Sequence, residues 1–125
     1  MQDLVLFFLI HFVIIVLYMS KLVVLSGVPG SGKSYFSKAL RKKKTSHVYI
    51  ISSDALRDLV TGNQQNLSED TLMWKMFYEL AKVYSADPNG IVVLDATNRS
   101  TEYRIDSVKE LKPQFDEADL VIFDI

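Results

Sequence analysis

Cysteine is absent from this sequence of 125 residues, and histidine occurs only twice. Without thiols the chain can form no disulfide, no thiolate metal site and no cysteine nucleophile, and with two histidines a zinc site is not expected. The formal net charge is only −1, so no global field would attract nucleic acid or an anionic membrane. Any charged ligand must therefore be recognised by a local group of residues.

An apolar run opens the sequence. Residues 4–19 read LVLFFLIHFVIIVLYM, which is apolar except for His11. These sixteen residues fall just short of the roughly 17–25 that a membrane-spanning helix needs. The run also lacks the basic start and the small-residue cleavage site of a signal peptide. Three interpretations stay open: a short membrane anchor, an extra helix or strand packed on the domain, and a translation start at Met19.

We favour a start at Met19, because the residues after it lead directly into the first expected strand. On this interpretation residues 1–18 are an extension, residues 19–125 are the domain, and the protein is cytoplasmic. If residues 4–19 are translated, we expect a membrane-anchored or aggregation-prone protein, because so long an apolar run needs covering.

From residue 22 onward, short apolar runs alternate with helical patterns. Strands are expected at residues 22–26, 47–51, 91–94 and 120–125. Helices are expected at residues 33–43, at 54–61 with Ser53 as the N-cap, after an N-cap at Ser68, and at 101–111. The third helix carries an apolar stripe at helical spacing, formed by Leu72, Met73, Met76, Phe77, Leu80 and Tyr84. This alternation predicts a three-layer α/β fold, a parallel sheet with helices on both faces.

One motif carries specific chemistry. Residues 27–34 read GVPGSGKS, which matches the phosphate-binding pattern G-x-x-x-x-G-K-[ST] between a strand and a helix. Glycines let successive backbone N–H groups converge on phosphate oxygens, and the helix N-terminus adds its positive dipole end. We therefore expect a P-loop that binds ATP or GTP through Gly27, Val28, Pro29, Gly30, Ser31, Gly32, Lys33, Ser34 and Tyr35.

Two carboxylates follow predicted strands. Asp54 comes after the second strand and Asp95 after the third, where ligands bind in open α/β sheets. Each has a plain alternative, Asp54 as an acid that stabilises a helix start and Asp95 as a loop residue. Beside a P-loop they suggest one general base and one carboxylate near Mg²⁺, while Lys33 reaches the β- and γ-phosphates and the Ser34 hydroxyl ligates the metal.

Residues 21–125 resemble the kinase domain of polynucleotide 5′-hydroxyl kinases and related small P-loop kinases. The resemblance rests on the P-loop, on SSDALR at residues 52–57, on VLDATN at residues 93–98, and on Arg104. It implies that Asp54 activates the 5′-hydroxyl and that Arg57 contacts a phosphate of the nucleic-acid acceptor. Their spacing of three places both on one helix face. The resemblance also implies a strand order of 2-3-1-4, which would bring Asp95 close to Ser34 and its Mg²⁺.

Other functions fit the same plan. Gluconate-type kinases, zeta-toxin-like kinases and antibiotic phosphotransferases share much of it, so a small-molecule acceptor stays open. The family continues into a helical lid with arginines, whereas no arginine follows Arg104 here. We therefore expect a truncated core that binds Mg·ATP and transfers phosphate slowly, or one half of a split enzyme. Arg99 or Arg104 could replace the lid arginines.

Overall fold

The computed structural model describes residues 3–6, 9–10, 20–28, 30–43, 47–96 and 101–123, except the side chains of 101–104. Several predictions lie outside these residues: most of the apolar run, Pro29, residues 97–99 and the side chain of Arg104. Over the described ranges, no helix has the length and hydrophobicity to cross a bilayer. The elements follow the order β1 (Lys21–Ser26), α2 (Lys33–Lys43), β2 (Val48–Ser52), α3 (Ser53–Thr61), α4 (Asp70–Tyr84), β3 (Ile91–Asp95), α5 (Thr101–Leu111), the 3-10 turn η1 (Lys112–Gln114) and β4 (Glu117–Ile122).

The four strands form one parallel sheet in the order β2-β3-β1-β4. The predicted fold class and the predicted strand order are therefore confirmed. The register pairs Leu25 of β1 and Ser52 of β2 with Asp95, the last residue of β3. Because parallel strands end at the same edge of the sheet, the segments that follow β1, β2 and β3 are brought together there.

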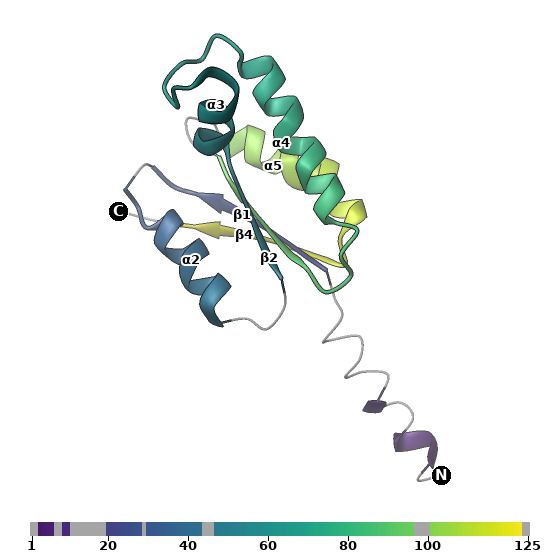
Figure 1. Cartoon of the computed structure of the whole chain (residues 1–125). Helices are drawn as coiled ribbons and strands as arrows, with labels where there is room; N and C mark the ends of the chain where they lie inside the picture. The colour runs from purple at the N-terminus through teal and green to yellow at the C-terminus, as the bar shows by residue number, and fades with distance from the viewer. Residues whose placement is uncertain are drawn as a thin grey trace.

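Alternating residues of the strands build two separate cores. Leu22 and Val24 point to the side covered by α3, α4 and α5, whereas Val23 and Leu25 point to the side of α2. Figure 1 shows α2 on one face of the sheet and α4 and α5 on the other. Strands buried on both faces need continuous apolar runs, which explains why β1 and β3 lack the polar alternation of an exposed sheet.

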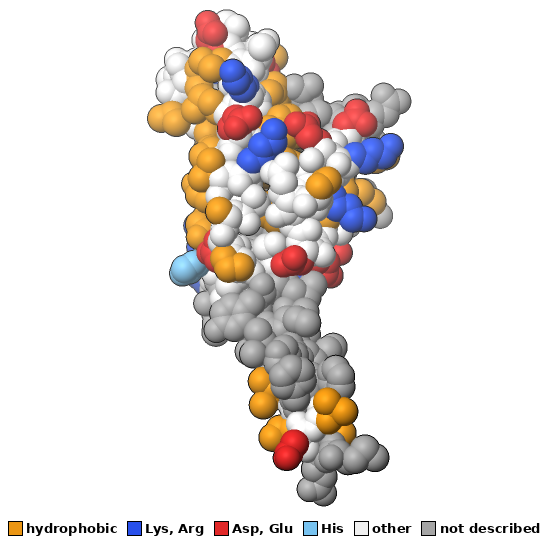
Figure 2. Space-filling view, turned by 90° about the vertical axis from the view of Figure 1, so that its right-hand side faces the viewer, with side chains coloured by type: hydrophobic (Ala, Val, Ile, Leu, Met, Phe, Trp, Pro, Cys, Tyr) orange, Lys and Arg blue, Asp and Glu red, His pale blue; other side chains and the backbone are white. Residues whose placement is uncertain are grey.

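The described surface carries mixed charge. On the face turned toward the viewer in Figure 2, acidic and basic side chains are interspersed over the folded body. This distribution agrees with the net charge of −1 and with the expectation that charged ligands are recognised locally.

The structure corrects both predicted helix caps. The N-cap of α3 is Ser52, whose hydroxyl accepts a hydrogen bond from the Ala55 N–H, while Ser53 is a fully buried residue inside the helix. The predicted cap Ser68 is also wrong, because α4 begins at Asp70 with Glu69 in the cap position and no side-chain cap bond. Strand β2 continues to Ser52, one residue further than predicted, and this extension moves the cap.

The apolar stripe of α4 and the start of β4 also differ in part from the predictions. Most of the predicted stripe of α4 faces the core, because Met73 and Phe77 are fully buried and Met76, Leu80 and Tyr84 pack against them partly buried, whereas Leu72 is 49% exposed. Trp74 and Ala81 complete the buried face. This face is selected by the neighbours of α4, which packs on α3, β2 and β3. Strand β4 begins at Glu117, three residues before its predicted start, because Ser20 accepts bonds from the N–H groups of Asp116 and Glu117 and so starts the pairing early.

Candidate active site

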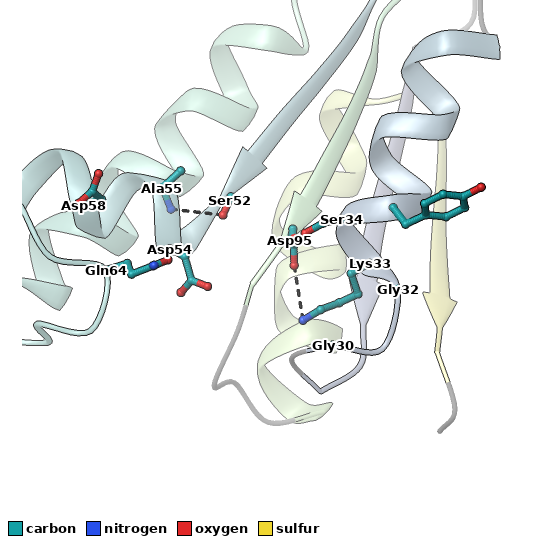
Figure 3. Close-up of a pocket in the computed structure, with 11 residues that line it drawn as sticks. Gly30, Gly32, Lys33, Ser34, Ser52, Asp54, Ala55, Asp58, Gln64 and Asp95 are labelled. Atoms are coloured by element: carbon teal, nitrogen blue, oxygen red, sulfur yellow. Dashed lines mark hydrogen bonds and ion pairs between the residues drawn. The ribbon is translucent and has the colours of Figure 1, made fainter.

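A cleft of about 640 Å³ opens at the carboxyl ends of the strands (Figure 3). This is the edge at which open α/β sheets bind ligands. One wall comes from the loop between β1 and α2, and the other comes from the end of β2, the start of α3 and the loop that follows it. The lining residues are Gly30, Gly32, Lys33, Ser34, Tyr35, Ser52, Asp54, Ala55, Asp58, Gln64 and Asp95.

The loop has the backbone that the P-loop motif predicts. Gly30 and Gly32 have φ angles of 83° and 106°, values that residues other than glycine rarely adopt. The Ser31 N–H donates to the Val28 carbonyl at 3.1 Å, and the Phe36 N–H donates to the Gly32 carbonyl at 2.9 Å. The loop is thus a tight turn that leads directly into the N-terminus of α2, a geometry suited to an anion.

Lys33 and Asp95, which both line the cleft, form a buried ion pair. Lys33 Nζ lies 3.4 Å from Asp95 Oδ1, and the side chains are only 4% and 10% exposed. Within the described part of the chain, neither of these two atoms has a hydrogen-bond partner, and nor does the buried Ser31 hydroxyl. Buried polar atoms that lack hydrogen bonds are costly, so three of them at one place, two of them joined only as an ion pair, indicate a site that a ligand completes.

The chemistry of these groups fits a triphosphate and a divalent cation. A lysine ammonium is a natural partner of phosphate oxygens, and carboxylate and hydroxyl oxygens are the protein ligands that Mg²⁺ takes. Asp95 and Ser34 both line the cleft and could hold the cation, while Lys33 stands beside them on the first turn of α2. The structure therefore brings together the two residues to which the sequence assigned the metal.

Asp54 lies on the opposite wall. It is the second residue of α3, and its side chain is 38% exposed, so the carboxylate is open to a reactant in the cleft. Figure 3 shows Asp54 on the α3 side of the cleft and the Lys33–Asp95 pair on the other side. A hydroxyl bound between the two walls could hydrogen-bond to Asp54 while facing the phosphate site.

Arg57 does not line the cleft in this structure. Its side chain is 2% exposed and turned inward, where it contacts Asp54, Asp70 and the carbonyl of Gln64. The spacing of three between Asp54 and Arg57 does place them on one helix face, but it pairs them with each other. That Arg57 contacts an acceptor phosphate stays a prediction.

Sequence reasoning missed part of the acceptor wall. Asp58 follows Asp54 by four residues on α3, and this spacing could have indicated a second carboxylate in the cleft. Gln64 comes from the loop between α3 and α4, and no sequence pattern signalled it. Among the predicted loop residues, Gly27, Val28 and Ser31 do not line the cleft wall, and Val28 is 58% exposed.

Comparisons with known proteins agree with this geometry. The sequence profile of a family described as "AAA domain" matches residues 22–123. The 2′,3′-cyclic-nucleotide 3′-phosphodiesterases of Rattus norvegicus and Mus musculus are each 31% identical over 94 residues, which make up 75% of this chain. The chain spans only 21% of the length of these relatives.

Two solved structures extend the comparison. The structure of the Pnkp1/Rnl/Hen1 RNA repair complex matches 86% of this chain and 34% of its own, with a TM-score of 0.75 and 25% identity. The APS kinase CysC of Mycobacterium tuberculosis matches 85% of this chain and 77% of its own, with a TM-score of 0.65 and 23% identity, a likeness of fold. The predicted resemblance to small P-loop kinases is therefore confirmed.

Proposed function

The chain belongs to the AAA domain family, and we propose that it binds Mg·ATP and transfers the γ-phosphate to the 5′-hydroxyl of a polynucleotide. The observation that carries this proposal is the buried Lys33–Asp95 ion pair, which lies across a cleft from Asp54. Its Nζ and Oδ1 atoms have no hydrogen-bond partner among the described residues. Such an arrangement supplies a phosphate site on one wall and a proton acceptor on the other.

Each residue has a distinct role in the proposed reaction. The loop N–H groups and Lys33 bind the phosphates, and Ser34 and Asp95 would hold Mg²⁺, which would spread the negative charge of the transferring group. The Asp54 carboxylate accepts the proton of the alcohol as its oxygen forms a bond to the γ-phosphorus. The bond from that phosphorus to the β–γ bridging oxygen breaks, and ADP leaves with the electron pair.

Two observations support a polynucleotide acceptor. The chain resembles polynucleotide 5′-hydroxyl kinases over SSDALR and VLDATN, and a solved structure of an RNA repair complex shares its fold at 25% identity. A small neutral alcohol is the second candidate. It is favoured by the α3 wall of the cleft, where Asp54, Asp58 and Gln64 supply oxygen acceptors and Arg57 is turned away.

The test is transfer of labelled γ-phosphate from ATP by the purified chain. The acceptors are a 5′-hydroxyl oligonucleotide, the same oligonucleotide with a 5′-phosphate, and a panel of nucleosides and sugars, and GTP serves as the alternative donor. We expect label on the 5′-hydroxyl oligonucleotide alone, and labelling about 10²- to 10⁴-fold slower with the Asp54→Asn variant. Label on a sugar or nucleoside would favour the second candidate, and binding of ATP without any transfer would overturn the phosphotransferase proposal.

A further inference from the structure

Arg57 makes four polar contacts in the interior of the protein. Its Nε and Nη2 donate to the two carboxylate oxygens of Asp70, at 2.9 and 3.2 Å, in a bidentate pair. Its Nη1 donates to Asp54 Oδ1 at 3.2 Å and to the Gln64 carbonyl at 3.3 Å. The guanidinium thus joins the start of α3, the loop after α3 and the first residue of α4.

The bidentate pair determines where the guanidinium points. A planar guanidinium that shares two parallel hydrogen bonds with a carboxylate is fixed in both position and plane. Because Asp70 occupies Nε and Nη2, the remaining nitrogen, Nη1, is directed at Asp54. At 2% exposure, Arg57 is shielded from the water that would otherwise loosen these contacts.

We infer that Asp70 is a positioning residue for Asp54 and acts through Arg57. This inference rests on the proposed function, in which Asp54 accepts the proton of the acceptor. Asp54 lines the cleft and is held at Oδ1 by Arg57, so this contact limits the orientations of its carboxylate. Correct orientation of a reacting group can change a rate by about a hundredfold. Arg57 therefore links Asp70 to Asp54.

A simpler role for Asp70 has to be separated from this one. Asp70 is the first residue of α4, where any acidic side chain stabilises the helix start. Glu69 provides the matched control, because it carries the same charge in the adjacent position, is exposed and makes no cap hydrogen bond. An effect of Asp70 that Glu69 does not reproduce cannot come from the helix dipole.

The kinetic test compares Asp70→Asn, Asp70→Glu and Glu69→Gln in the full chain, with thermal unfolding measured for each variant. We expect Asp70→Asn to lower kcat about 10- to 100-fold with an unchanged KM for ATP, and Asp70→Glu to restore part of the loss. Glu69→Gln should keep the parental kcat. An unchanged kcat in Asp70→Asn would overturn this inference alone, whereas absence of transfer by the parent protein would overturn the proposed function and this inference with it.

A spectroscopic measurement tests the contact without catalysis. The Nε–Hε signal of Arg57 in the ¹⁵N-labelled protein is assigned by its loss in Arg57→Lys. We expect slow exchange of this proton with water in the parent and in Glu69→Gln, and fast exchange in Asp70→Asn. Fast exchange in the parent would show that Asp70 does not hold the guanidinium, and this result would stand even if Asp70→Asn failed to fold.

Discussion

Polar groups at the two ends of the parallel sheet differ in whether they have hydrogen-bond partners. At the carboxyl end, Lys33 Nζ, Asp95 Oδ1 and Ser31 Oγ are buried without hydrogen-bond partners in the described chain. At the amino end, the Asp87 carboxylate accepts from Tyr49 at 2.8 Å and from the Asn89 N–H at 3.0 Å. His47 Nδ1 lies 2.9 Å from Oδ2 of the same carboxylate. The rings of Tyr49 and Tyr84 are stacked, with their centroids 4.4 Å apart.

This difference separates stability from function. Polar groups that satisfy one another stabilise the folded chain, whereas buried groups that lack partners cost stability until a ligand supplies them. Parallel strands direct the segments that follow them to the carboxyl end, so that end can collect residues from distant parts of the chain. Substitutions there should change binding and transfer, and substitutions at the amino end should change stability.

The largest effect is expected for Asp54→Asn. Asparagine keeps the shape of the side chain but cannot accept a proton, so phosphate transfer should fall about 10²- to 10⁴-fold while ATP affinity is unchanged. Single-turnover kinetics and calorimetry measure the two quantities. The control is Asp106→Asn on α5, an exposed residue that does not line the cleft. A full transfer rate in Asp54→Asn would remove Asp54 from the role of base.

Lys33→Ala should have the next largest effect. Loss of a charged hydrogen bond to phosphate costs about 1.5–3 kcal/mol, so triphosphate affinity should fall about 10- to 100-fold. The melting temperature should fall as well, because the variant leaves the buried Asp95 carboxylate without its ion-pair partner. Lys38→Ala, an exposed lysine on the same helix, is the matched control in calorimetry and thermal unfolding. Equal affinity in Lys33→Ala and parent would refute the phosphate site.

Gly90→Ala tests the packing of the amino end. An added Cβ would lie 3.0 Å from Tyr49 Cε2 and 3.1 Å from Asp87 Cβ, so both side chains would have to move. Overpacking of this kind costs about 1–3 kcal/mol, and thermal unfolding should show a lower melting temperature with unchanged ATP affinity. A weaker ATP affinity at full stability would mean that the two ends of the sheet are not independent.

The smallest effect is expected for Asp87→Asn, and it should depend on pH. The hydrogen bonds from His47, Asn89 and Tyr49 lower the pKa of the Asp87 carboxyl below its usual value. A carboxyl with a lowered folded pKa contributes stability above its unfolded pKa of about 3.9, and this contribution disappears as the pH falls through the folded value. Urea unfolding should therefore separate variant and parent at pH 7 and not in strong acid. A difference that grows in acid would contradict this account.

A second contribution to stability, from the hydrogen bond between Tyr49 and Asp87, is lost when the pH rises. The hydrogen bond to Asp87 raises the pKa of the Tyr49 hydroxyl. The stability contributed by this bond is present below the unfolded pKa of about 10 and disappears as the pH rises through the folded value. Tyr49→Phe serves as the control for Asp87→Asn, because it removes one of the three contacts and keeps the aromatic ring stacked on Tyr84.

Local signals in the sequence were sufficient for the elements that short-range chemistry controls. The P-loop pattern predicted the turn and the start of α2 at Lys33, because glycine conformation and helix initiation depend on adjacent residues. Helix α3 ends at Thr61 as predicted, and Gly62 follows it in the left-handed conformation that favours glycine. The strand order followed from the resemblance to P-loop kinases and is confirmed, which also explains why Asp95 lies beside Lys33.

Only the tertiary structure decided the direction of Arg57. Its spacing from Asp54 was visible in the sequence, but its main partner, Asp70, lies thirteen positions later on a helix that packs against α3. The same holds for the exposure of Leu72 on α4 and for the contacts of Asp87 with His47 and Tyr49, which come from before β2 and within β2. Contacts of this kind depend on which elements pack together. Packing is determined by the free energy of the whole chain, so a short segment of the sequence does not reveal these contacts.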